Sequence, residues 1–185
     1  MMIKRFLAVT TAAVATILST AAPGLTTGSF GEHKRLYDTI RSYGVTVHIN
    51  NPKYCDGRID GSYHSFQRVL SVCQDNQSYM NNEVDWTAND LDTLRHEAHH
   101  MIQDCALNGI GDGNLSLLFG DIDQSKEFVA SVLPESQQRE LMSFDSYSGH
   151  NAYRQMIELE AFATAAAISP SDIADKMNEM CGPRR

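Results

Sequence analysis

The spacing of apolar residues changes along the first half of the chain, from that of a helix to that of strands. Over residues 31–43 the apolar residues recur three or four positions apart, which predicts a helix with one buried face that ends at Gly44. Residues 45–49 alternate between apolar and polar and predict a half-buried strand. Residues 62–73 are rich in aromatic and β-branched residues and predict a second strand or a bent pair of strands.

The second half of the chain is expected to be helical. The segment Thr87-Ala-Asn-Asp90 matches a capping box, and a periodic run continues from it to about Leu107. After a loop rich in Gly and Asp, further helices are expected over residues 123–133, 134–142, 149–168 and 171–180. Because strands come early and helices late, we expect an α+β fold. A small N-terminal sheet should pack on the central helix, and a helical C-terminal half should follow.

The N-terminal residues have the layout of a secretory signal peptide. Two basic residues precede an apolar run over residues 6–18, and small residues follow it. The run has about 13 residues, whereas a membrane span needs about 20, so an uncleaved N-terminal anchor is the less favoured alternative. We therefore expect a signal peptide over residues 1–22, with cleavage between 21 and 29. A single domain over residues 23–185 should follow, in a secreted or periplasmic protein.

The charge of the chain narrows the classes of partner. The sequence has 23 acidic and 15 basic residues and a net charge of -8. Removal of the signal peptide would also remove Lys4 and Arg5 and make the net charge more negative by two. A groove for nucleic acid needs an excess of Lys and Arg, so the composition argues against this partner. An anionic membrane surface is disfavoured for the same reason. No other stretch of the sequence is long and apolar enough to span a bilayer.

The four cysteines predict two disulfides. None forms a C-x-x-C pair, which argues against a zinc ribbon, and an even number in an exported chain is typical of disulfide bonding. Of the three possible pairings we favour Cys55–Cys73, which closes the strand-rich segment, and Cys105–Cys181, which ties the last residues to the central helix. Each bond would stabilise the fold by about 3 kcal/mol through loop closure. Four free buried thiols are the alternative.

Candidate chemistry is concentrated in the central helix, in the segment His96-Glu97-Ala98-His99-His100. His96 and His100 are four positions apart, so their imidazoles stack on one helix face and can hold one zinc ion through nitrogen. Glu97 is rotated by about 100° from His96 and can reach a zinc-bound water as a general base. His99 lies about 60–100° away from the pair and is expected to stay outside the ligand set.

The two histidines face away from the apolar side of their helix. That side is formed by a stripe of Leu91, Leu94, Ala98, Met101, Ile102 and Cys105. His96 and His100 lie on the opposite side with Asn89 and Gln103. This placement argues against ordinary core histidines and leaves a polar, solvated helix face as the remaining alternative.

A third ligand is expected from the helix over residues 149–168, which is apolar nearly all round and should be buried. A buried carboxylate is costly unless it is paired or bound to metal, and this helix carries two, Glu158 and Glu160. They are about 200° apart, so one face of the helix cannot present both to the same ion. Ordinary ion pairs are the alternative, with Arg154 one turn before Glu158.

The HEAHH motif followed by the ELEAFA segment resembles the gluzincin group of zinc metallopeptidases. In that group the two motif histidines and a Glu from a later helix bind zinc, and the motif Glu is the base. Glu158 opens the sequence ELEA, which fits the E-x-E-A pattern of several branches, so the resemblance implies Glu158 as the third ligand. Glu160 opens EAFA and is the alternative. The resemblance covers residues 87–106 and 150–167, and no N-E-x-x-S-D motif is present.

The resemblance implies a zincin-like fold and an exported zinc metallopeptidase that hydrolyses peptide bonds of a peptide or protein substrate. Near the Glu-bearing helix, the candidates to stabilise the oxyanion are Tyr147, His150 and Tyr153. As in the proteins it resembles, we expect an upstream strand, here residues 45–49, to lie along the cleft and to pair with an extended substrate.

Other functions have weaker support. The aspartates of the Gly- and Asp-rich loop, Asp112, Asp121 and Asp123, suggest calcium only weakly, because they miss the EF-hand spacing, and a solvated loop is favoured. A secreted zinc-binding protein without turnover is one alternative function. A zinc hydrolase of cell-wall peptide cross-links is another.

Overall fold

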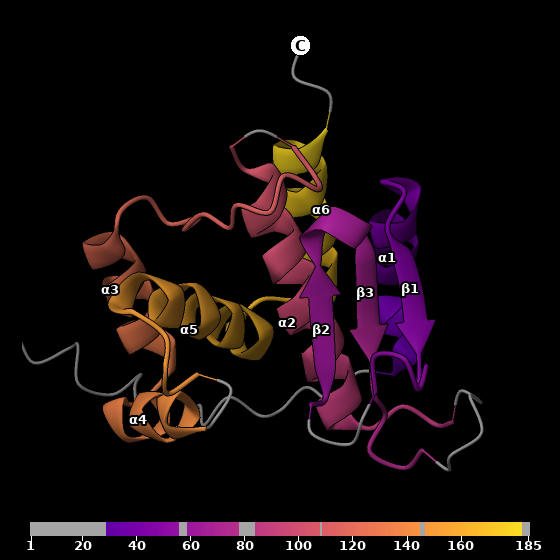
Figure 1. The fold of residues 1–185 in the computed structure, drawn as a ribbon, viewed down its shortest axis with the longest axis horizontal. Coiled ribbons are helices and arrows are strands. Elements are labelled where there is room, and N and C mark those ends of the chain that lie inside the picture. Colours follow the sequence, from indigo (N-terminus) through magenta and orange to yellow (C-terminus); the bar gives the residue numbers. More distant parts are fainter. Residues whose placement is uncertain (1–28, 56–58, 78–83, 108, 145–146, 183–185) are drawn as a thin grey trace, which may run out of the picture.

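The helix α2 (Ala88–Cys105) lies at the centre of the molecule and separates two groups of elements. The computed structural model describes residues 29–55, 59–77, 84–107, 109–144 and 147–182, so the expected signal peptide lies outside the described residues. The other helices are α1 (Phe30–Ser42), α3 (Ile122–Val132), α4 (Glu135–Ser143), α5 (Ala152–Ala167) and α6 (Pro170–Cys181). Figure 1 shows the sheet and α1 on one side of α2, and α3, α4 and α5 on the other.

The sheet has three strands, in the order β1-β3-β2. The strands are β1 (Thr46–Ile49), β2 (Gly61–His64) and β3 (Val69–Val72). β3 lies in the middle, parallel to β1 and antiparallel to β2. A single 3-10 turn, η1 (Ser65–Gln67), joins β2 to β3, so the expected bent pair over residues 62–73 is confirmed.

One core fills the space between the sheet, α1, α2 and α6. Its fully buried side chains include Leu36 and Ile40 of α1, Leu70 and Val72 of β3, Leu94, Ala98, Met101 and Ile102 of α2, and Ile173 and Met177 of α6. The apolar stripe expected on the central helix is therefore buried as its spacing predicts. The capping box that begins α2 is formed, with Thr87 Oγ1 accepting from the backbone N–H of Asp90 and the Asp90 carboxylate accepting from that of Thr87.

A second apolar cluster holds α5 against its neighbours on the other side of α2. It is built from Val129, Leu133, Met156, Leu159 and Ala163. Because α5 packs on both α2 and α3, apolar residues are needed on most of its circumference, as its sequence indicates. The fold class is α+β, as expected: α1 comes first, the three strands follow it, and the other helices come after the strands.

Both expected disulfides are confirmed. Cys55–Cys73 joins the segment after β1 to the residue that follows β3, with a Cα–Cα distance of 5.5 Å. Cys105–Cys181 joins the last residue of α2 to the last residue of α6, with a Cα–Cα distance of 5.2 Å. The end of the central helix is thereby fixed to an element that lies far along the sequence. No helix in the part of the chain that the structure describes has the length and apolar character needed to cross a membrane.

We predict that the two disulfides contribute unequally to stability. Their sequence separations are 18 and 76 residues. Loop-closure entropy gives about 3 kcal/mol for the shorter loop and about 4.5 kcal/mol for the longer one. The double replacement Cys105→Ser/Cys181→Ser should therefore lower the free energy of unfolding more than Cys55→Ser/Cys73→Ser, as measured by urea denaturation. The reverse order would show that strain or residual structure, rather than loop length, sets the contribution.

Candidate metal centre

Three side chains from two helices converge between α2 and α5. His96 and His100 come from successive turns of α2, and their Nε2 atoms lie 3.0 Å apart. Glu158 of α5 places its Oε2 3.1 Å from His100 Nε2 and 3.5 Å from His96 Nε2. The structure thus brings Glu158, rather than Glu160, to the two imidazoles.

The three atoms have the separation that one zinc ion requires. Zinc bonds of about 2.0–2.1 Å in tetrahedral geometry place neighbouring ligand atoms about 3.3 Å apart. The observed separations of 3.0, 3.1 and 3.5 Å lie on both sides of this value. Two imidazole nitrogens and one carboxylate oxygen are also the donor set of many catalytic zinc sites. These residues therefore fit a zinc ion that would keep its fourth position open.

Glu160 lies on the other side of α5 and has a different environment. Its side chain is fully buried, and five donors surround the carboxylate: His99 Nε2, Gln103 Nε2, Ser125 Oγ and the backbone N–H groups of Leu118 and Phe119. This satisfies both oxygens and explains how a carboxylate can be buried there. The expected separation of Glu158 and Glu160 around the helix is confirmed. His99, expected outside the ligand set, binds Glu160.

Glu97 lies beside the pair of histidines and against the sheet. Its side chain is buried, and the backbone of Tyr63 in β2 comes close enough to the carboxyl to oppose, weakly, the rise of its pKa on burial. A Cβ on Gly61 would lie 2.5 Å from Thr93 Cγ2 and 3.2 Å from Glu97 Cγ, so only glycine allows β2 to approach α2 this closely. The strand beside Glu97 is therefore β2, and the expectation that residues 45–49 lie there is wrong. Strand order depends on pairing between distant segments, which local spacing does not reveal.

Burial and mutual contact shift the pKa values of these groups. Burial raises the pKa of the Glu97 carboxyl to about 7 and lowers the pKa of His96 to about 4. Burial also opposes the charge of His100, but the adjacent Glu158 carboxylate outweighs it and raises the pKa of His100 to about 9. Burial likewise disfavours the charge of Glu158, but His100 and His96 hold the pKa of this carboxyl far below its ordinary value. Glu158 is therefore charged at neutral pH.

The three candidates for oxyanion stabilisation lie at different distances from the cluster. The ring of Phe162 packs against His96, with centroids 4.3 Å apart, and Tyr147 packs edge-on against Phe162 at 5.8 Å. His150 lies next to Tyr147, at 6.2 Å between ring centroids. Tyr153 is 45% exposed. Tyr147 and His150 thus approach the cluster through Phe162, whereas Tyr153 lies on the surface.

The three aspartates between the end of α2 and the first turn of α3 have local structural roles. Asp121 caps α3 by accepting from the backbone N–H groups of Asp123 and Gln124, and Asp112 accepts from that of Asn114. Asp123 forms an exposed ion pair with Lys126. These contacts agree with a solvated loop, the interpretation favoured from the sequence.

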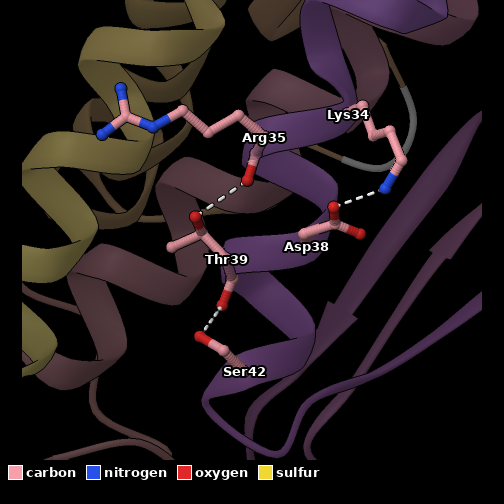
Figure 2. A pocket seen from close by; sticks show the side chains of 5 residues that line it. All are labelled: Lys34, Arg35, Asp38, Thr39 and Ser42. Atoms are coloured by element: carbon pink, nitrogen blue, oxygen red, sulfur yellow. Dashed lines mark hydrogen bonds and ion pairs between the residues drawn. The ribbon is translucent and has the colours of Figure 1, made fainter.

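A surface pocket lies elsewhere on the molecule, along the exposed side of α1 (Figure 2). Its lining residues are Lys34, Arg35, Asp38, Thr39 and Ser42. Lys34 forms an ion pair with Asp38, Thr39 Oγ1 donates to the carbonyl of Arg35, and the Arg35 guanidinium forms an ion pair with Asp175 of α6. None belongs to the His and Glu cluster, and we assign this pocket no function.

Sequence reasoning missed two contacts of the cluster. Gln103 was placed on the polar side of α2, yet it is fully buried and its Oε1 lies 2.7 Å from His100 Nδ1. Its position three residues after His100, on the same helix face, was the available signal. The contact of Phe162 with His96 is the second, and nothing in the spacing of this apolar helix indicates it.

Comparisons with known proteins identify no relative. No protein-family model, no curated protein and no solved structure matches the chain significantly. The geometry of the cluster is therefore the basis for any statement about function.

We predict that the two carboxylates of α5 differ in their effect on stability. Glu160→Gln replaces an acceptor oxygen by an NH₂ group that faces other donors, and should cost about 2–4 kcal/mol. The matched variant Glu158→Gln should cost less, because the Glu158 side chain is 16% exposed and, within the described residues, its polar partners are the two imidazoles. Urea denaturation in the presence of a chelator measures both. A greater loss in Glu158→Gln would contradict the structural role of Glu160.

Proposed function

We propose that this protein is an exported zinc metallopeptidase that hydrolyses peptide bonds. The observation that carries the proposal is the convergence of His96, His100 and Glu158 at tetrahedral separations, with the buried carboxyl of Glu97 on the same helix beside them. A purely structural zinc site has no need of this additional carboxyl. The resemblance of the HEAHH and ELEA motifs to the gluzincins, and hence a zincin-like arrangement, supports the same function.

Three residues bind the metal ion in the proposed reaction, and a fourth transfers the proton. His96, His100 and Glu158 would hold zinc, which supplies Lewis-acid activation of a water molecule and of the substrate carbonyl when bound. Glu97 takes a proton from the attacking water and returns it to the leaving amine, so one carboxyl acts as base and then as acid. The backbone of Tyr63 in β2 lies beside this carboxyl.

The position of β2 favours an extended peptide as the substrate. β2 is an edge strand, and its residues Gly61 and Tyr63 lie against Thr93 and Glu97 of α2. Edge strands bind extended peptides by adding them to the sheet. A peptide held along β2 would bring its carbonyl groups close to Glu97. The two disulfides support export, because such bonds persist in oxidising compartments.

We predict one zinc ion per chain, bound by the three residues of the cluster. His96→Ala, His100→Ala and Glu158→Ala should each lower the zinc content after dialysis, because each removes one of three protein ligands. His48→Ala, in β1, is the matched control and should retain zinc. Elemental analysis of the purified mature chain measures the content. A wild-type chain that takes up no zinc would exclude the proposed function.

We predict that Glu97→Gln retains zinc and loses hydrolysis of casein by at least about 100-fold, the typical contribution of a general base. Glu140→Gln, at an exposed position of α4, is the control and should keep full activity. Activity against peptidoglycan cross-links is measured in parallel. Unchanged hydrolysis in Glu97→Gln would remove Glu97 as the base. A wild-type chain that binds zinc and cleaves neither substrate would indicate a zinc-binding protein without turnover.

A further inference from the structure

The side-chain amide of Gln103 bridges the candidate zinc ligand His100 and the buried carboxylate of Glu160. Its Nε2 donates to Glu160 Oε2 at 2.8 Å and to the backbone carbonyl of Ile157 at 3.2 Å. Both partners can only accept, so the amide nitrogen must face them. The amide oxygen must then face His100, because the two ends of the group point in opposite directions.

This orientation of Gln103 determines which nitrogen of His100 carries the hydrogen when the ring is neutral, as a metal ligand must be. Gln103 Oε1 lies 2.7 Å from His100 Nδ1 and has no hydrogen to give. Nδ1 must therefore be the donor, and Nε2 is the nitrogen left for an ion. That Nε2 is the atom that lies 3.1 Å from Glu158 Oε2 and 3.0 Å from His96 Nε2. The hydrogen bond to Nδ1 also fixes the rotation of the ring.

Glu160 can impose this orientation because its own position is fixed from several directions. Ser125 Oγ donates to its Oε1 at 2.9 Å from α3, and the backbone N–H groups of Leu118 and Phe119 donate at 3.1 and 3.2 Å. The carboxylate is inaccessible to water and is surrounded by donors. A flipped Gln103 amide would place its oxygen against this carboxylate, which costs electrostatic energy in a buried site.

We propose that Glu160 and Gln103 are positioning residues for the zinc ligand His100, with Glu160 acting through Gln103. Glu160 holds the amide of Gln103 in one orientation, and Gln103 holds the ring of His100 with its Nε2 toward the ion. The inference rests on the proposed zinc site and assigns to it two residues that touch neither metal nor substrate. It also gives the second carboxylate of α5 a function at the site without making it a ligand.

The zinc affinity of Gln103→Met tests the proposal. Methionine is close to glutamine in size but forms none of these three hydrogen bonds, so the ring of His100 loses its fixed orientation. Loss of such a contact typically weakens metal binding by about 10–100-fold, which competition with a chelator measures. The matched control is Gln74→Met, because Gln74 is equally buried and hydrogen-bonded, to Asn50 and Val84, on the sheet side of the molecule. It should leave zinc affinity unchanged even where it lowers stability.

A second measurement can already contradict the inference in the wild-type chain. In the wild-type chain the Nδ1–H of His100 should give a slowly exchanging NMR signal, with or without zinc, and Gln103→Met should lose it. Absence of this signal from the wild type overturns the inference. Unchanged zinc affinity in Gln103→Met overturns it as well. A wild-type chain that shows the signal but binds no zinc overturns the proposed function instead, so the two failures are distinguishable.

Discussion

The structure depends on the requirement that a charge buried between helices be surrounded by hydrogen-bond donors. Glu160 has no exposed surface, and its carboxylate collects donors from α2, from α3 and from the segment that precedes α3. A hydrogen bond to this carboxylate also fixes the position of the group that donates it. The helices beside α5 are therefore held in register by a polar contact, whereas the apolar cluster around Val129 and Leu159 supplies non-directional burial.

The helix α5 presents its two carboxylates to different environments. Glu158 is partly exposed and lies against two imidazole nitrogens, while Glu160 is enclosed by donors. One residue lies between them in the sequence, and the geometry of the helix turns them to opposite sides. This separates the group proposed to bind a cation from the group that holds the surrounding side chains. The aromatic ring of Phe162, one turn after Glu158, covers His96 on the same side as Glu158.

Local patterns in the sequence were sufficient for most of the elements and for the pairing of His96 with His100, whereas the choice of Glu158 over Glu160 came from the resemblance of the ELEA motif. The helical spacing of His96 and His100, and the rotation between Glu158 and Glu160, are properties of a single helix and need no tertiary information. The disulfide pairing was also anticipated from the placement of the cysteines relative to the elements. The choice of β2 as the strand beside Glu97 was not, because it depends on the pairing of both outer strands with β3. The burial of Gln103 was missed because α5, which contacts it, comes some 50 residues later.

The disulfide between Cys105 and Cys181 sets an order for the assembly of the molecule. Its two partners are the last residues of α2 and α6, so the bond closes only after α3, α4, α5 and α6 have all emerged. In a chain that emerges from its N-terminus, α2, which carries His96 and His100, has no covalent bond at its C-terminal end until α6 is present. The covalent bond that holds the end of α2 therefore cannot form until residue 181, as well as residue 105, is exposed to oxidising conditions.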